Sequence, residues 1–368
     1  MPARLRLFRL HFDPPPRGDT VPASDTSSHP TLTSAPETVS AVTLARRPSG
    51  VPQVDDFELR TLDREPLAPG RVRVRVRDLS LDPYLISLLG EGHMGDSALP
   101  LGAVVPGRAV AEVVEVAGSI ALAVGDLVVA ETGWRSEAVL DAAAVTPVEA
   151  PEDLPASAAL GVLGMPGLTA YAAHVRHLRP KVGDTVVVSA ATGGVGSLAG
   201  ALARLAGART VAVVGSREKA RVAVEEVGYD EAVVRTEDDW VEQLRAACPA
   251  RVDGYLHMAD QATLDGVLEQ LAIGARVSLV GVIDQTLGAP PTRLRAGAVM
   301  GARATVHGMV VYDHHDLAAE HRTRVAALLR AGQVTLREHR FEGLEQAARA
   351  FHTLMTGANV GKVVVGVS

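Results

Sequence analysis

One stretch decides the fold: Val186-Val-Val-Ser-Ala190-Ala-Thr-Gly193-Gly-Val-Gly196-Ser197. An apolar β-branched run stops at small residues, and a glycine turn leads into an alanine- and leucine-rich pattern over 195–206. This order predicts a strand, a tight turn and a helix, with glycines where a pyrophosphate would approach the backbone. The unpaired N–H groups and the dipole of the first helical turn favour an anion there. The stretch indicates a dinucleotide site, although a tight turn without a ligand has the same pattern; the candidate contacts are Ala190, Gly193, Gly194, Val195 and Gly196.

Strand and helix patterns alternate after residue 164. Helical patterns follow the first four of five strand patterns, which cover residues 184–190, 210–214, 231–234, 253–258 and 275–281. Strands that alternate with helices predict a parallel sheet with right-handed crossovers, which is a doubly wound α/β fold.

The segments on either side of this block read as mostly β. In Arg71–Arg77 valines alternate with arginines, which predicts a half-buried strand whose arginine face is solvated. The final apolar run, 362–367, predicts a strand that returns to this first part of the chain. We therefore expect one domain inserted in another, with the boundaries 41–163 plus 337–368 for the β-rich substrate domain and 164–336 for the nucleotide-binding domain.

Composition narrows the classes of partner. The chain has 368 residues and a net charge of −7, which does not favour nucleic acid or an anionic membrane surface. No apolar run approaches the ~20 residues that a membrane span needs, so we expect a cytoplasmic protein. The single cysteine, Cys248, argues against a disulfide framework and a multi-cysteine zinc site, and we expect no bound metal. Residues 1–40 are rich in proline, serine and threonine and are predicted to be a disordered extension, with an import sequence or a misassigned start as alternatives.

The residues after the second strand indicate which dinucleotide binds. A carboxylate at the end of that strand would bind the ribose 2′-hydroxyl of NAD, but the strand is followed by Gly215-Ser-Arg-Glu-Lys219. Gly215 leaves room, Ser216 can donate a hydrogen bond, and Arg217 and Lys219 supply positive charge, which suits a 2′-phosphate and hence NADPH. Glu218 between them works against this unless its side chain points away. Arg235 ends the third strand and adds a second charge or stacks on adenine. The alternative is ordinary solvated charge at the start of a helix.

Several motifs, in order and spacing, resemble those of one family. They are Leu79-Ser-Leu-Asp-Pro-Tyr84, Leu160-Gly-Val-Leu-Gly-Met-Pro-Gly-Leu-Thr-Ala-Tyr171, the glycine turn, Gly215–Lys219 and Gly357-Ala-Asn-Val-Gly-Lys362. Residues 41–368 resemble the zinc-independent medium-chain dehydrogenases/reductases, in the branch of NADPH-dependent alkenal/one oxidoreductases that includes the prostaglandin reductases.

The resemblance implies a GroES-like substrate domain, a Rossmann domain and an active site between them. It also implies reduction of a small α,β-unsaturated carbonyl compound: hydride passes from the nicotinamide to the β-carbon, and the resulting enolate takes a proton. Carried over by position, Lys219 binds the 2′-phosphate, Asn359 lies near the nicotinamide, and Tyr84 faces the substrate as a catalytic candidate. Family members are often homodimers joined through the edge of the Rossmann sheet.

The chain departs from the family pattern on the nicotinamide side. Thr286 stands where a tyrosine usually can hydrogen-bond the enolate oxygen, His257-Met-Ala-Asp-Gln261 replaces Asp-Asn-Val-Gly-Gly, Arg235 replaces a tyrosine and Ile86 replaces an arginine. Losing one enolate donor costs on the order of 10²–10³ in rate if nothing replaces it. Either Tyr84 or the ribose hydroxyl takes over, or the substrate is easier to reduce, or the enolate attacks a second electrophile, as in a reductive cyclase of polyketide or polyene biosynthesis. A catalytically inactive NADPH-binding protein is a further alternative.

Of five other residues, all but Cys248 carry two readings. His257 ends the fourth strand and is either a proton donor at neutral pH or a structural histidine. The pair His314-His315 has two readings, a metal site and a solvated turn. The solvated turn is favoured, because adjacent residues of an extended segment point to opposite faces. Trp134 either lines the substrate cleft or packs in the core, and Cys248 is expected to be inert.

Overall fold

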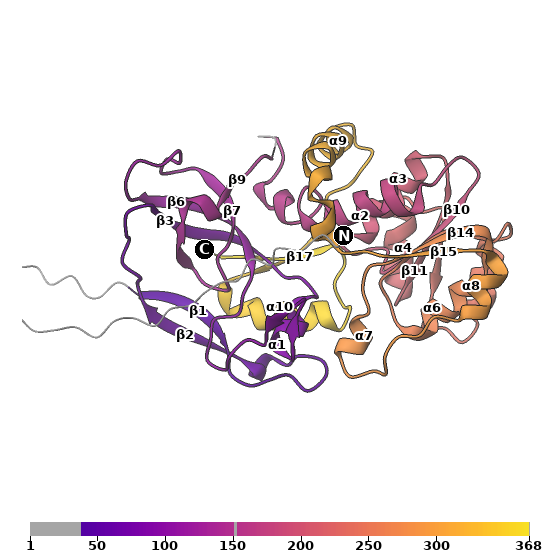
Figure 1. Ribbon diagram of the computed structural model, residues 1–368, viewed down its shortest axis with the longest axis horizontal. Helices are drawn as coiled ribbons and strands as arrows, with labels where there is room; N and C mark the ends of the chain where they lie inside the picture. The colour runs from indigo at the N-terminus through magenta and orange to yellow at the C-terminus, as the bar shows by residue number, and fades with distance from the viewer. Residues whose placement is uncertain (1–37, 151–152, 368) are drawn as a thin grey trace, which may run out of the picture. The chain divides into compact units, whose positions relative to one another are not determined.

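Two large sheets organise the described chain, which comprises residues 38–150 and 153–367 of this computed structural model (Figure 1). The predicted disordered extension lies outside the described residues as far as residue 37. For residues 38–40 the prediction of disorder is wrong, because these residues begin strand β1 (Thr38–Leu44). This strand is ordered because it pairs antiparallel with β2 (Phe57–Asp63) along its whole length.

The sheet that follows the glycine turn has six parallel strands in the order β12-β11-β10-β13-β14-β15. The first strand of the unit, β10, lies inside, and the order reverses beside it, which is the doubly wound arrangement that the sequence predicts. The strand bounds are β10 (Thr185–Ser189), β11 (Arg209–Val214), β12 (Glu231–Val234), β13 (Val252–His257), β14 (Leu271–Leu279) and β15 (Thr305–Gly308).

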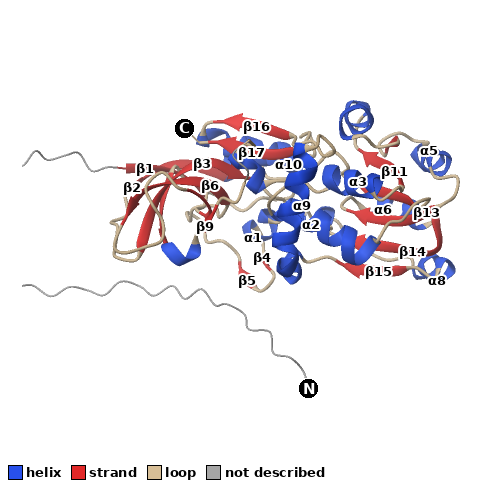
Figure 2. Ribbon diagram, turned by 90° about the horizontal axis from the view of Figure 1, so that it is seen from above, coloured by secondary structure: helices blue, strands red, loops and turns tan. Residues whose placement is uncertain are grey.

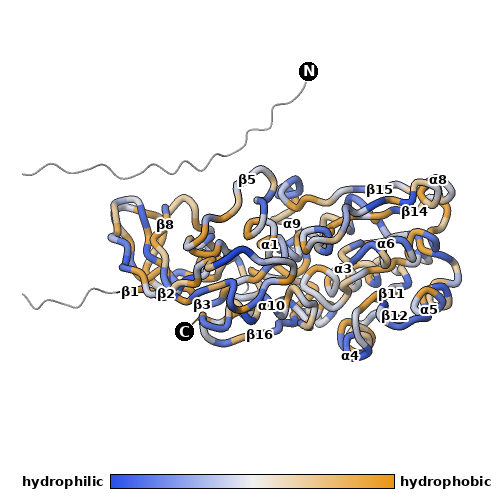
Figure 3. The backbone as a smooth tube through the Cα atoms, turned by 90° about the horizontal axis from the view of Figure 1, so that it is seen from below, coloured by the Kyte–Doolittle hydropathy of each residue, from blue (hydrophilic) through white to orange (hydrophobic). Residues whose placement is uncertain are grey.

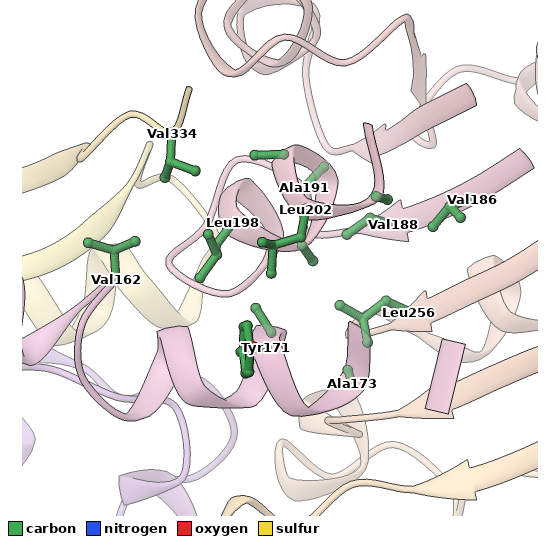
Figure 4. Packing of buried hydrophobic residues seen from close by; sticks show 14 of the residues in the cluster. Val162, Tyr171, Ala173, Val186, Val188, Ala191, Leu198, Leu202, Leu256 and Val334 are labelled. Atoms are coloured by element: carbon green, nitrogen blue, oxygen red, sulfur yellow. The ribbon is translucent and has the colours of Figure 1, made fainter. Parts of the chain in front are cut away.

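Helices cover both faces of this sheet because alternate strand residues point to opposite sides (Figure 2). Val186 and Val188 pack with Leu198 and Leu202 on one face (Figure 4), and Val187 packs with Leu244 on the other. The first face is covered by α2 (Met165–Ala172, continued by a π-helical turn, Ala173–Leu178), α3 (Gly196–Leu205) and α9 (Ala318–Arg330); the second is covered by α5 (Trp240–Ala247), α6 (Gln261–Leu268) and α8 (Ala296–Ala302).

The second large sheet belongs to the β-rich part and has the order β16-β17-β3-β6-β7-β9, with β8 paired to β3. The last strand, β17, pairs antiparallel with β3, so the chain returns to its first sheet. The strands are β3 (Arg71–Ser80), β6 (Arg108–Val116), β7 (Leu127–Glu131), β8 (Glu137–Asp141), β9 (Thr146–Pro147), β16 (Glu338–Glu342) and β17 (Lys362–Gly366). The exact domain boundaries stay predictions.

Short elements complete the fold. They are α1 (Leu85–Leu89), β4 (Gly92–His93), β5 (Asp96–Ser97), α4 (Arg217–Val222), α7 (Ile283–Thr286) and α10 (Ala347–Met355). Figure 3 colours much of α4 as hydrophilic, and its residues Arg217, Glu218 and Arg221 are exposed. None of the helices in the described ranges is long and apolar enough to cross a membrane.

Strand β3 shows one correction to the sequence reading. Val72, Val74 and Val76 are fully buried as predicted, but the arginine face is not uniformly solvated, because Arg73 is only 5% exposed. Its guanidinium pairs with Glu115 and lies 3.2 Å from Glu137 Oε1. Two carboxylates therefore supply the partners that a buried guanidinium requires.

Trp134 belongs to the core of the β-rich part. Its ring is fully buried and stacks on Phe57 with the ring centroids 5.4 Å apart, and it meets Phe351 edge-on. Gly107 makes room for it, since a Cβ at that glycine would lie 2.8 Å from the indole. Of the two readings for Trp134, the structure supports packing.

Candidate cofactor and substrate site

The glycine turn forms a backbone cradle at the start of α3. Ala190 has a left-handed backbone (φ 49°), and a Cβ at Gly196 would lie 2.5 Å from the Ala190 carbonyl oxygen. Val195 precedes the helix without a side-chain cap, so the first-turn N–H groups are not occupied by a capping side chain. A close backbone approach, a required glycine and uncapped N–H groups fit a dinucleotide pyrophosphate.

The end of β11 leaves open space next to a capped helix. No heavy atom lies within 4 Å of a Cβ built on Gly215. Ser216 caps α4, and its hydroxyl oxygen accepts a hydrogen bond from the Lys219 backbone N–H at 3.2 Å. The hydroxyl hydrogen is left to donate to a ligand, as the sequence reading requires.

Three basic side chains near this space differ in how their charges are balanced. Arg217 is 87% exposed and pairs with Glu237 at 2.6 Å, while Arg235 pairs with Asp260. Lys219 makes no ion pair within the described residues, and its ammonium donates to the Gly357 carbonyl. Burial and the charge of Arg235 lower the pKa of Lys219. The charge of Glu218 acts in the opposite direction without forming an ion pair, so an anion at this position would stabilise the ammonium further.

The motif Gly357–Lys362 lies against the glycine turn. The Gly361 N–H donates to the Thr192 carbonyl at 2.8 Å, and Asn359 is buried with its amide nitrogen bonded to the Gly361 carbonyl at 2.8 Å. Segments about 165 residues apart are thus brought together. Asn359 is close to the cradle, as its proposed place near the nicotinamide requires.

Lys362 joins both parts of the chain and was missed as a site residue by the sequence reading. Its ammonium is 2.8 Å from Asp82 Oδ1 and donates to the Leu81 carbonyl, with the two side chains 6% and 9% exposed. Its stem lies 3.4 Å from where a Cβ on Gly194 would be. The signal in the sequence was its rarity, because the chain has three lysines.

The structure contains a cavity of about 310 Å³. Its walls come from β6, β7 and β9, from the segment that enters α2, and from residues 311–322. Among the lining side chains are Arg108, Glu131, Met165, Tyr312 and Arg322. Arg108 pairs with Glu131 at 2.7 Å and Arg322 pairs with Glu149 at 2.8 Å, so both arginine charges at the cavity are compensated.

Tyr84 does not line this cavity, but the charges of Glu131 and Arg108 act on its hydroxyl. Burial, then the negative charges of Glu131 and Asp82, raise the pKa of its hydroxyl, so the phenol stays protonated at neutral pH. That hydroxyl has no hydrogen-bond partner within the described residues, and the ring packs 5.3 Å from the His93 ring. A protonated, unpaired phenol is available to donate to a substrate oxygen.

His257 is not placed to act as an imidazolium acid. The ring is fully buried, its Nδ1 lies 2.7 Å from the Tyr255 hydroxyl oxygen, and burial lowers its pKa to about 4. The imidazole is therefore neutral at pH 7, which corrects the reading of a protonated donor and favours the structural one. Its Nε2 has no hydrogen-bond partner in the part of the chain that the structure describes.

The two adjacent histidines lie in different surroundings, and the cysteine is buried. His314 is buried and bonded to Arg176 at 2.9 Å, which corrects the solvated turn, whereas His315 lines the cavity. Across the described ranges, no three histidine, cysteine or acidic side chains are grouped to hold a metal. Burial raises the pKa of Cys248 to about 12, in keeping with an inert thiol.

Comparison with known proteins identifies the family. Residues 40–148 match the model for the N-terminal domain of oxidoreductase, and residues 194–326 match the model for zinc-binding dehydrogenase. The NADPH-dependent curcumin reductase of Escherichia coli is 33% identical over 88% of this chain and 96% of its own. The 2-alkenal reductase (NADP(+)-dependent) of Nicotiana tabacum is 33% identical over 87% and 95%. The chain belongs to the zinc-independent medium-chain dehydrogenases/reductases.

A solved structure of this family agrees in fold. CurA from Vibrio vulnificus in complex with NADPH has a TM-score of 0.84 and 32% identity, covering 89% of this chain and 99% of CurA. The sequence-based prediction of the family and of the Rossmann sheet beside a β-rich domain is therefore confirmed. The individual site residues stay predictions.

Proposed function

We propose that this medium-chain dehydrogenase/reductase uses NADPH to reduce the activated carbon–carbon double bond of a small α,β-unsaturated carbonyl compound. The relatives named for alkenal and curcumin reduction support the reaction class. The observation that carries the cofactor assignment is Lys219, a partly buried ammonium without a carboxylate partner next to the open space at Gly215. The names of the relatives give no support to a reductive cyclase or to an inactive binding protein.

The chain's own residues divide the work of holding NADPH. The cradle of Ala190, Gly193, Gly194, Val195 and Gly196 would hold the pyrophosphate through backbone N–H groups. Ser216 and Lys219 would bind the 2′-phosphate, Arg235 would lie by the adenine with its charge already balanced by Asp260, and Asn359 would lie near the nicotinamide. NADPH supplies the hydride when it is bound.

Tyr84 is the proposed donor to the substrate carbonyl. Its phenol is protonated at neutral pH and has no partner within the described residues, so it can donate to the oxygen on which negative charge develops. In this proposal Tyr84 takes over the role of the tyrosine that the family usually has where this chain has Thr286. His257 is neutral and buried, and we assign it no proton transfer.

The proposed quaternary state is a homodimer, and the proposed location is the cytoplasm. Strand β15 (Thr305–Gly308) pairs with β14 and forms one edge of the nucleotide-binding sheet, so one side of its backbone is open to a second copy. Ile273 and Met300 are 76% and 77% exposed, a pattern that an association surface would explain. Light scattering coupled to size-exclusion chromatography tests this; a monomer at micromolar concentration contradicts it.

The experiment for the activity uses the purified chain, NADPH and a panel of enals and enones. We expect the NADPH absorbance to fall with at least one substrate and NADH to be a much poorer donor. NMR of the product should show a saturated carbonyl compound without a new ring bond. Tight NADPH binding with no turnover on the whole panel contradicts the proposal.

A further inference from the structure

The cavity contains a charge pair that lies directly across two neighbouring strands. Arg108 on β6 and Glu131 on β7 are register partners in the antiparallel ladder. The guanidinium Nε and Nη2 lie 2.8 Å and 2.7 Å from the same carboxylate oxygen, Glu131 Oε1. The two side chains are 37% and 55% exposed, and cross-strand partners of opposite charge stabilise each other, so the pair forms part of the cavity wall.

Another part of the cavity lining lies close to the proposed cofactor cradle. Gly164 and Met165 line the cavity and are followed directly by Pro166. The Pro166 Cβ lies 3.5 Å from where a Cβ on Gly194 would be. This contact leads us to place the far end of the substrate in this cavity, which the charge pair also lines.

The charge of the pair determines which chemical group at the far end of a substrate can lie against this wall. A half-buried arginine without a partner would bind a carboxylate strongly. Glu131 cancels that charge, and it would repel a second carboxylate at close range. Arg108 Nη1 has no hydrogen-bond partner in the described ranges, so it can still donate to an uncharged oxygen.

We propose that Glu131 is a specificity-determining residue: by neutralising Arg108, it makes the cavity accept unsaturated carbonyl compounds with a neutral oxygen group at the far end and reject those with a carboxylate. This inference rests on the proposed reductase activity. It assigns the selection to the paired state of Arg108 rather than to the size of the cavity.

The test compares two substrates that differ in charge at one end. They are benzalacetone with a para-methoxy group and benzalacetone with a para-carboxylate, and the readout is the ratio of kcat/KM for the carboxylate to that for the methoxy compound. We expect the ratio to be about 0.1 or lower for the unaltered chain. In Glu131→Gln it should rise about 10-fold, because an unpaired guanidinium gains a charge-assisted hydrogen bond. In Arg108→Gln it should fall further, since Glu131 remains as an unpaired negative charge.

The opposite directions separate selection from a structural effect. A merely structural role would change both substrates alike and leave the ratio constant. Glu112→Gln is the matched control, because Glu112 lies on β6, pairs with Arg77 at 2.6 Å and is not among the cavity-lining residues; its ratio should not change. Inhibition by the saturated para-carboxylate ketone gives a second readout, and it should strengthen about 10-fold in Glu131→Gln.

Three results overturn the inference. They are an equal or higher kcat/KM for the carboxylate in the unaltered chain, a ratio that neither variant moves by more than about two-fold, and a shift in the same direction in both variants. If the unaltered chain reduces neither compound nor any other enone, the proposed function fails instead, which is a distinguishable result.

Discussion

The proposed nucleotide end and the proposed substrate end of the site both carry basic side chains, but their charges are paired differently. At the nucleotide end Arg217 and Arg235 pair with carboxylates, whereas Lys219 donates to a carbonyl and makes no ion pair in the described residues. At the substrate end Arg108 and Arg322 each pair with a glutamate within 2.8 Å. An uncompensated cation calls for a permanently anionic ligand, whereas a compensated one offers hydrogen bonds without net charge. The difference suits a phosphate at one end and a neutral carbonyl compound at the other.

Removing Lys362 should have the largest effect, because this residue joins the β-rich part to the glycine turn. Lys362→Met leaves Asp82 as a buried carboxylate without a cationic partner, with only the Ser80 hydroxyl, among the described residues, still donating to it, and we expect the free energy of unfolding to fall by about 3–5 kcal/mol. Urea denaturation measures it. The double variant Lys362→Met with Asp82→Asn should recover part of the loss, and an equally unstable double variant would show that packing, not charge, is responsible.

Tyr84→Phe sharpens the comparison at the substrate end. We expect kcat to fall about 10²-fold, because the phenol donates to the oxygen that gains charge. The dissociation constant for NADPH, measured by fluorescence titration, should stay within about two-fold. A kcat that changes less than three-fold would move the donor to another group, such as the ribose hydroxyl.

Lys219→Ala tests the uncompensated cation at the nucleotide end. The dissociation constant for NADPH should rise about 30-fold through loss of one charge-assisted hydrogen bond, while that for NADH stays unchanged. Arg217→Ala is the matched control, since Arg217 is exposed and already paired with Glu237, and it should weaken NADPH less than three-fold. Equal weakening of NADPH and NADH in Lys219→Ala would contradict a 2′-phosphate contact.

The smallest expected effect is the pH dependence of stability in the nucleotide-binding part. Burial lowers the pKa of His174, His177, His257 and His321 to about 4, below the ordinary 6.5. Between pH 4 and 6.5 the unfolded chain binds more protons than the folded one. The neutral histidines therefore contribute their full stability above pH 6.5, and this contribution is lost as the pH falls toward 4. Urea midpoints measured across this range should decrease with acidification. His257→Asn should flatten the dependence, and an unchanged slope would show that this ring titrates normally.

Much of the nucleotide end was readable from the chain alone. The β-branched run before Ala190, the glycines and the missing carboxylate after β11 predict a strand, a turn and an anion site through local properties of consecutive residues. The same local reasoning predicted a solvated arginine face for β3 and failed at Arg73, because burial there depends on Glu115 and Glu137 from two other strands.

What only the tertiary structure decided is which charges are paired. Lys362 and Asp82 are 280 residues apart, and Arg108 and Glu131 meet only because β6 and β7 pair in one register. Pairing between distant residues follows from sheet order and strand register, and neither leaves a period or spacing in the sequence. The sequence by itself thus determined the fold class and the nucleotide, through contacts that are local in the chain. The substrate end was decided by long-range packing, which turns isolated charges into neutral pairs.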